Sequence, residues 1–192
     1  MKKLCTLVIA FTLIVVSAKS QIQAGNLLWG ADIANFDLGL NKGGQFSIQL
    51  DPKLAYFVSN NLALGGYVNF GLTTSKGAGQ DINYGVGLLG RYYLGTETNV
   101  VRNSRFFLEG NAGIEGTNPA SGSNTNGLGL GIGPGWTYFL TNNIGLEALL
   151  KYRGIVGFGD RVTSSDLQLH VGFQIYLPSA QLRRRLEGSK KM

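Results

Sequence analysis

The chain has 192 residues, of which 17 are Lys or Arg and 11 are Asp or Glu, so its formal net charge is +6. The basic excess lies at the two ends. The first twenty residues hold three lysines and no acid, and residues 178–192 hold five basic residues and one acid, so residues 21–177 keep nine basic and ten acidic residues. A body this close to neutral argues against a nucleic-acid-binding surface, and we expect no nucleic-acid partner.

The N-terminus has the pattern of a secretory signal. Two lysines precede an apolar run from Leu4 to Ala18, and small residues stand just before Gln21. This pattern predicts a signal peptide at residues 1–20 that is removed on export. The alternative is a retained membrane anchor, but a spanning helix needs about 20 apolar residues and this run is shorter. The only cysteine, Cys5, lies in this segment, so we expect no disulfide and no thiolate metal site in the mature chain.

Apolar and polar residues alternate along almost all of residues 21–177, which is the pattern of half-buried β-strands. Eight such segments follow one another, and their apolar positions begin at Leu27, Phe46, Leu62, Ile82, Phe106, Leu128, Ile144 and Leu167. No segment sustains a helical period of 3.6 residues. The sequence therefore predicts an all-β domain.

The register opposite the apolar one holds every charge of these segments together with many glycines, as in "GLGLGIGPG" (127–135). A soluble calycin-type ligand-binding barrel would turn the apolar register inward, whereas a membrane barrel turns it toward lipid. Glycine weakens strands on a solvated surface, but small residues suit the narrow interior of eight strands. Segments of about 10–12 residues also fit the 9–11 that a tilted spanning strand needs. We predict an eight-stranded antiparallel up-and-down transmembrane β-barrel at 21–177, with the soluble barrel as an alternative and a basic, disordered tail at 178–192.

An internal repeat supports two similar halves. "DPKLAYFVSNN" (51–61) and "GPGWTYFLTNN" (133–143) share a proline, an aromatic pair and a closing Asn-Asn at an offset of 82 residues, and residues 85–94 similarly resemble residues 168–177. The repeat predicts the same hairpin twice, each closed by an Asn-Asn turn. Because proline cannot donate to a ladder, we expect Pro52 and Pro134 to lie at a local gap or bulge.

The order of these segments, with "GRYYL" (90–94) and a last strand that alternates to an aromatic end, resembles the outer-membrane β-barrel family, in particular the small OmpA/OmpX-like eight-stranded barrels of Gram-negative bacteria. The resemblance covers residues 27–177. It implies a monomer at the cell surface in the outer membrane, with lipid and the barrel-assembly machinery as partners. It also implies periplasmic termini and periplasmic connections at 58–61, 95–105 and 140–143. The extracellular loops, which could bind an unidentified ligand, would then be 37–44, 73–81, 116–126 and 154–165.

The same resemblance implies an assembly signal near the end of the last strand. Family members commonly finish at an aromatic residue, whereas here fifteen residues follow, so the signal would be internal at Phe173, Tyr176 and Leu177. Deletion of the tail should then leave membrane insertion intact.

A structural ion cluster is the main candidate site. Arg91, Glu109 and Glu147 lie at similar depth on the polar register, so Arg91 is expected to pair with Glu109 on the adjacent strand while Glu147 approaches across the lumen. The alternative is general acid/base chemistry by the two carboxylates, but buried charges are normally paired for structural reasons. An aromatic girdle is expected on the opposite register, at Trp29, Tyr56, Tyr92, Trp136 and Tyr138.

Enzymatic and cofactor sites are less well supported. "GVGLLG" (85–90) matches a dinucleotide fingerprint, but a strand and not a helix follows it. His170, the only histidine, falls on the inward register, away from the lipid-facing surface where the outer-membrane lipid A deacylases hold their catalytic residues. We expect no catalysis, no cofactor and no metal. The sequence favours a non-catalytic outer-membrane barrel with a filled lumen and a structural or adhesion-type role, and a small porin-like transport barrel is the alternative.

Overall fold

The computed structural model describes residues 22–38, 45–75, 77, 79–95, 103–122, 124–158 and 164–178. The predicted signal peptide and all of the predicted tail except Pro178 lie outside these residues. Over the described residues the chain forms eight strands: β1 Leu27–Leu38, β2 Gln45–Ser59, β3 Leu62–Ser75, β4 Gly79–Leu94, β5 Ser104–Asn118, β6 Thr125–Phe139, β7 Ile144–Gly157 and β8 Ser164–Leu177. No helix in the described part of the chain is long and apolar enough to cross a membrane.

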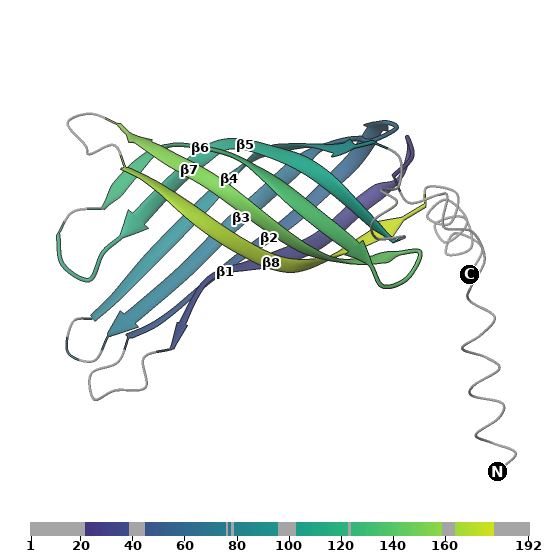
Figure 1. The fold of residues 1–192 in the computed structure, drawn as a ribbon. Coiled ribbons are helices and arrows are strands. Elements are labelled where there is room, and N and C mark those ends of the chain that lie inside the picture. Colours follow the sequence, from purple (N-terminus) through teal and green to yellow (C-terminus); the bar gives the residue numbers. More distant parts are fainter. Residues whose placement is uncertain are drawn as a thin grey trace, which may run out of the picture.

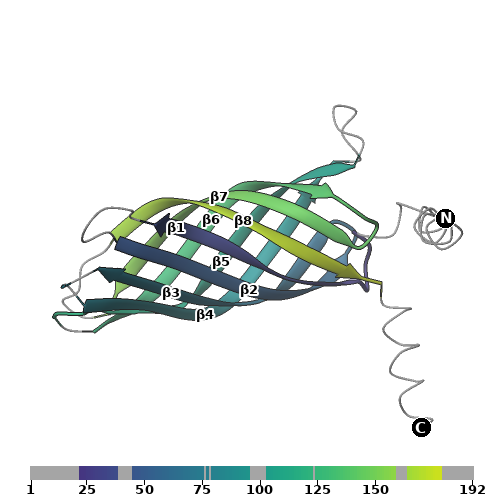
Figure 2. The same cartoon turned by 90° about the horizontal axis from the view of Figure 1, so that it is seen from below.

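The strands close into a single barrel in sequence order, each antiparallel to the next, and β8 pairs with β1 (Figures 1 and 2). The all-β, up-and-down prediction is confirmed. The short connections at 60–61 and 140–143 lie at the same end as residues 22–26, and we call this the turn end (right in Figure 1). The opposite end, where β1 runs toward β2 and β3 runs toward β4, is the loop end.

Most strands are longer than the predicted 10–12 residues, with 14 residues in β3 and 16 in β4, whereas β1 has 12. The predicted loops 73–81, 116–126 and 154–165 are correspondingly too long, because their outer residues belong to strands. Only the middle of loop 37–44 separates β1 from β2, and residues 39–44 lie outside the described part. Residues 96–102 of the predicted 95–105 connection do so as well.

The strands were predicted too short at the loop end because this end is rich in Ser, Asn and Gly, which do not signal a strand as clearly as β-branched and aromatic residues do. Pairing between neighbouring strands outweighs this weaker propensity. The Ser47 hydroxyl lies 3.0 Å from the Thr73 hydroxyl, and the Thr117 hydroxyl donates to Asn83 Oδ1 at 2.7 Å.

Pro52 and Pro134 lie at matching gaps in the ladders, as predicted. Between β2 and β3 the pairing runs to Leu50 and resumes at Lys53 in the same register. Between β6 and β7 it runs to Ile132 and resumes at Gly135, again without a shift. The interruption is a gap and not a bulge, and it follows from the missing N–H of proline.

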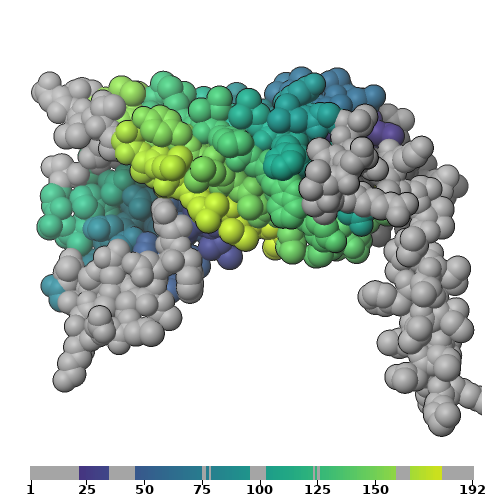
Figure 3. Space-filling view, viewed as in Figure 1, coloured from purple at the N-terminus to yellow at the C-terminus, as the bar shows by residue number. Residues whose placement is uncertain are grey.

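The apolar register faces outward along the whole wall. Leu88 on β4 is 74% exposed and Trp29 on β1 is 55% exposed, whereas Arg91 on the opposite register is completely buried. Figure 3 shows part of this outer wall, where the green and yellow side chains of β7 and β8 meet along the surface. A soluble barrel would hold its charges outside and its large apolar side chains inside, so the calycin-type alternative is wrong.

Candidate functional site: the charged core of the lumen

Arg91 lies at the centre of the buried charges. It stands directly opposite Glu109 in the ladder between β4 and β5, and its Nη2 and Nε atoms lie 2.6 and 3.0 Å from Glu109 Oε2. Its Nη1 atom reaches across the lumen to Glu147 Oε1 at 2.7 Å. The three residues proposed from the sequence are thus in direct contact.

The cluster is larger than the sequence indicated. Lys53 Nζ lies 2.6 Å from Asp32 Oδ2 and 3.1 Å from Glu109 Oε2, and Lys151 Nζ lies 3.1 Å from Glu109 Oε1. The lumen ion cluster therefore contains Asp32, Lys53, Arg91, Glu109, Glu147 and Lys151, three positive and three negative charges. Buried charges are costly unless paired, and this set balances itself.

Glu109 is the shared acceptor of the lumen ion cluster, because it contacts Lys53, Arg91 and Lys151. Removal of the Glu109 charge would therefore leave both lysines and Arg91 beside only two carboxylates, so Glu109 balances the whole cluster and not only Arg91.

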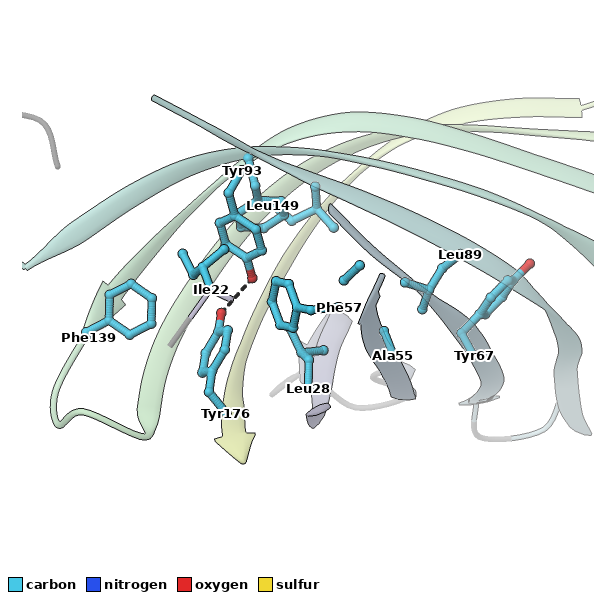
Figure 4. Packing of buried hydrophobic residues seen from close by; sticks show 12 residues of the cluster. Ile22, Leu28, Ala55, Phe57, Tyr67, Leu89, Tyr93, Phe139, Leu149 and Tyr176 are labelled. Carbon is cyan, nitrogen blue, oxygen red and sulfur yellow. Dashed lines mark hydrogen bonds between the residues drawn. The ribbon is translucent and has the colours of Figure 1, made fainter. Parts of the chain in front are cut away.

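Five aromatic rings of the buried cluster fill the lumen on the turn-end side of the ion cluster. Figure 4 shows this packing and labels Phe57, Tyr93, Phe139 and Tyr176. This aromatic plug consists of Phe57, Tyr93, Phe107, Phe139 and Tyr176, all less than a tenth exposed. Neighbouring ring centroids lie 5.2 to 6.4 Å apart, within the range of favourable aromatic packing. The Arg91 guanidinium stacks at 4.0 Å from the centroid of the Phe107 ring, which joins the plug to the ion cluster.

Two hydroxyl groups extend the polar network into the plug. The Tyr93 and Tyr176 hydroxyls lie 2.7 Å apart, and Tyr176 donates to Glu147 Oε1 at 2.9 Å. Thr137 donates to the same oxygen at 2.9 Å. These donors satisfy a buried carboxylate oxygen that also binds Arg91.

Sequence reasoning missed the aromatic plug, although a signal for it exists. Adjacent aromatic residues occur at the turn end of four strands, as Tyr56-Phe57, Tyr92-Tyr93, Phe106-Phe107 and Tyr138-Phe139. Because consecutive strand residues point to opposite faces, each pair must place one ring outside and one inside.

A second polar layer lies on the loop-end side of the ion cluster. The Asp51 carboxylate accepts hydrogen bonds from Gln49 and Asn69, and His170 Nδ1 lies 3.0 Å from its Oδ2 atom. Glu115 binds Arg153 Nη2 at 2.5 Å and accepts a hydrogen bond from the Tyr67 hydroxyl at 2.9 Å. His170 is thus an inward residue beside a carboxylate.

The lumen glycines make room for these long side chains. A Cβ atom at Gly87 would stand 2.7 Å from the Tyr67 ring, and one at Gly113 would stand 2.8 Å from the Tyr67 hydroxyl. A Cβ at Gly85 would similarly stand 2.8 Å from the Glu115 side chain. Glycine on this register is therefore required by packing, as the narrow interior of eight strands demands.

The other predicted residues divide between the two faces. Trp29, Tyr56 and Tyr92 are half exposed on the outer wall near the turn end, and Trp136 and Tyr138 share that register, with ring centroids 6.0 Å apart. Their role as a girdle stays a prediction. In the proposed assembly signal, Phe173 is half exposed on the wall, whereas Tyr176 lies inside in the aromatic plug.

The charged groups of this site are paired with one another. Each carboxylate of the ion cluster binds a cation, and the aromatic plug separates the cluster from the turn end. Within the described ranges, no three His, Cys, Asp or Glu side chains converge as a metal site would require.

Comparison with known proteins places the fold. No family model and no curated protein matches the sequence. Among solved structures, the N-terminal β-barrel domain of Pseudomonas aeruginosa OprF superposes with a TM-score of 0.55 at 16% identity, over 80% of this chain and 98% of that one. The Neisserial surface protein A, NspA, superposes with a TM-score of 0.52 at 19% identity, over 78% of this chain and 95% of that one.

The chain has the fold of the small eight-stranded outer-membrane β-barrels. This fold accounts for the apolar wall and the polar lumen together. At these identities the likeness concerns the fold alone.

Proposed function

We propose that the protein is a non-catalytic outer-membrane barrel with a closed lumen, which serves as a structural element and presents its loop end for surface interactions. The observation that supports this most is the lumen ion cluster. Six balanced charges and five aromatic rings occupy an interior that, with eight strands, has room only for side chains. By analogy with the fold, the turn end would face the periplasm.

The loop-end rim favours an interaction role. Tyr84 donates to Asn126 Oδ1 at 2.7 Å, the Ala120 N–H donates to Asp81 Oδ1 at 2.7 Å, and Thr117 binds Asn83. These bonds tie the loop-end parts of β4, β5 and β6 together. A braced rim of this kind would present loops in a fixed arrangement, as binding loops on rigid scaffolds do.

Conductance in planar bilayers tests the closed lumen. The purified protein should give no stable ion-conducting steps, whereas a small porin-like barrel, the competing function, would give steps whose size rises with salt concentration. Exchange of the loop around residues 119–124 for that of an unrelated small barrel, followed by a whole-cell binding assay, tests the interaction role. Unchanged binding after every loop is exchanged would contradict it.

A further inference from the structure

Residues 22–26 form a short segment that precedes β1 and folds back at the turn end. Ile22 is 9% exposed and belongs to the same buried cluster as Tyr93, Phe139 and Tyr176 (Figure 4). Asn26, at the other end of the segment, is 4% exposed. The segment is therefore packed against the aromatic plug and not extended away from the barrel.

Four hydrogen bonds attach this segment to β2 and to the turn that follows it. They run from Gly25 N to Phe57 O at 2.8 Å, from Phe57 N to Asn26 O at 2.9 Å, from Ala24 N to Asn60 Oδ1 at 3.0 Å, and from Asn61 N to Ile22 O at 3.4 Å. Asn61 has a φ of 69°, a conformation that asparagine tolerates better than most residues. The Asn-Asn turn thus holds the segment with both its side chain and its backbone.

A cover at this position has a physical reason. The bilayer shields the outer wall of a barrel, but it does not shield the mouth, so apolar rings at the mouth would face water. Ile22 belongs to the buried cluster that contains these rings, and its segment lies at the mouth. The attachment includes one buried apolar side chain and four hydrogen bonds, and removal of the predicted signal peptide would leave it close to the end of the mature chain. Short terminal segments of this kind open locally before the fold does.

We propose that residues 22–26 are a cap that closes the turn-end mouth of the lumen, and that detachment of the cap admits water and small solutes to the aromatic plug and the charges behind it. The proposal rests on the proposed function, because it names the segment that keeps the filled lumen closed.

Cysteine labelling of the full-length protein tests the cap. Ala63 faces the lumen at the turn end, is completely buried and belongs to the same cluster as Ile22, so Ala63→Cys in a Cys5→Ser background places one thiol behind the cap. The reagent is a small charged methanethiosulfonate, applied to the folded barrel in detergent. Ile22→Asp should release the cap, because it sets a charge against aromatic rings. Ala24→Asp is the matched control, with the same charge two residues away on an exposed position.

The thiol should react slowly in the parent and in the Ala24→Asp variant, and at least about tenfold faster in the Ile22→Asp variant, the factor expected when burial of one isoleucine is lost. Asn60→Ala, which removes only the bond to Ala24, should give an intermediate rate and provides a second variant if Ile22→Asp does not fold. Equal slow labelling in the parent, Ile22→Asp and Asn60→Ala would overturn the cap and leave the closed lumen standing. Fast labelling in the parent would overturn the closed lumen itself.

Discussion

The hydroxyl groups of Tyr93 and Tyr176 lie 2.7 Å apart inside the barrel, although the two residues are 83 positions apart in the chain. They come from β4 and β8, whose sequences resemble each other. The Tyr93 N–H donates to the Asn61 carbonyl at 2.8 Å, and the Tyr176 N–H donates to the Asn143 carbonyl at 2.7 Å. The two halves of the internal repeat therefore meet at this hydrogen bond.

The two tyrosines should contribute unequally to stability. Tyr176→Phe removes a donor from the buried Glu147 carboxylate and should lower the free energy of unfolding by about 1–3 kcal/mol, the range for an unsatisfied buried group. Tyr93→Phe leaves the bond between Tyr176 and Glu147 in place and should cost less. Urea unfolding of the detergent-refolded barrel measures both. A larger effect for Tyr93→Phe would contradict this order.

The lumen ion cluster should show strong coupling between Arg91 and Glu109. Arg91→Met leaves the cluster with one excess negative charge and Glu109→Gln leaves one excess positive charge, so each should cost about 3–5 kcal/mol. The double variant restores neutrality and should be more stable than the sum of the two single effects indicates. Urea unfolding of the three variants gives the coupling energy. Additivity within about 0.5 kcal/mol would mean that the two residues do not interact.

Neighbouring glycines on opposite faces should respond with opposite sign. A Cβ at Gly113 would stand 2.4 Å from the Val86 carbonyl oxygen and 2.8 Å from the Tyr67 hydroxyl, whereas at Gly110 the nearest atom lies 3.8 Å away. Gly113→Ala should therefore destabilise the barrel by about 1–3 kcal/mol through overpacking. Gly110→Ala, the matched control, should stabilise it by roughly 0.4–1 kcal/mol, because alanine has less conformational entropy to lose. Unfolding midpoints in urea test the pair, and similar shifts in one direction would refute the packing argument.

Changes near the end of β8 should affect membrane insertion and folding stability separately. Deletion of residues 178–192 should leave membrane insertion in cells intact. Phe173→Ala should reduce insertion, because Phe173 lies on the outer wall. Val171→Ala, at a neighbouring position on the same face, is the matched control. Tyr176→Phe should insert normally and be less stable. The amount of protein in the outer-membrane fraction is the measurement, and loss of insertion on deletion of the tail alone would exclude an internal signal.

Tryptophan fluorescence should locate the girdle. The chain has two tryptophans, Trp29 and Trp136. In bilayers, spin labels near the lipid headgroup should quench their emission more than labels deep in the acyl chains, since aromatic girdles lie at the interface. As a control, Leu130→Trp with both native tryptophans changed to Phe should show the reverse depth dependence. Deep quenching of the native pair would disprove the girdle.

The alternating pattern of the strands predicted most of the fold, because it records which face of the wall each residue occupies. It did not predict which side chains contact one another inside the lumen. Lys53 and Asp32 face one another from neighbouring strands, yet Lys53 also reaches Glu109, 56 positions away on β5. Which inward residues meet across a lumen depends on the stagger of all eight strands, and a local pattern does not contain that stagger.

The strand ends were predicted less well for a related reason. At the loop end, polar residues occupy both faces of the wall, as the adjacent Thr73 and Thr74 on β3 show, so the alternation between apolar and polar residues fades there. At the turn end, adjacent rings obscured the distinction between outside and inside. Tyr176, which has no aromatic neighbour in the sequence, shows a separate difficulty, because an aromatic residue near the end of the last strand fits an assembly signal whereas the structure places it in the aromatic plug.

The ion cluster also decides how the two halves of the chain can combine. Strands β1 to β4 supply Asp32, Lys53 and Arg91, one positive charge in excess, and strands β5 to β8 supply Glu109, Glu147 and Lys151, one negative charge in excess. In sequence, the halves repeat each other, with the same proline, aromatic pair and Asn-Asn turn. Two copies of either half would bring like charges together in a dry interior, whereas one of each gives a neutral core. The two halves of the repeat are therefore complementary in charge inside the lumen, and these inward residues prevent one half from replacing the other.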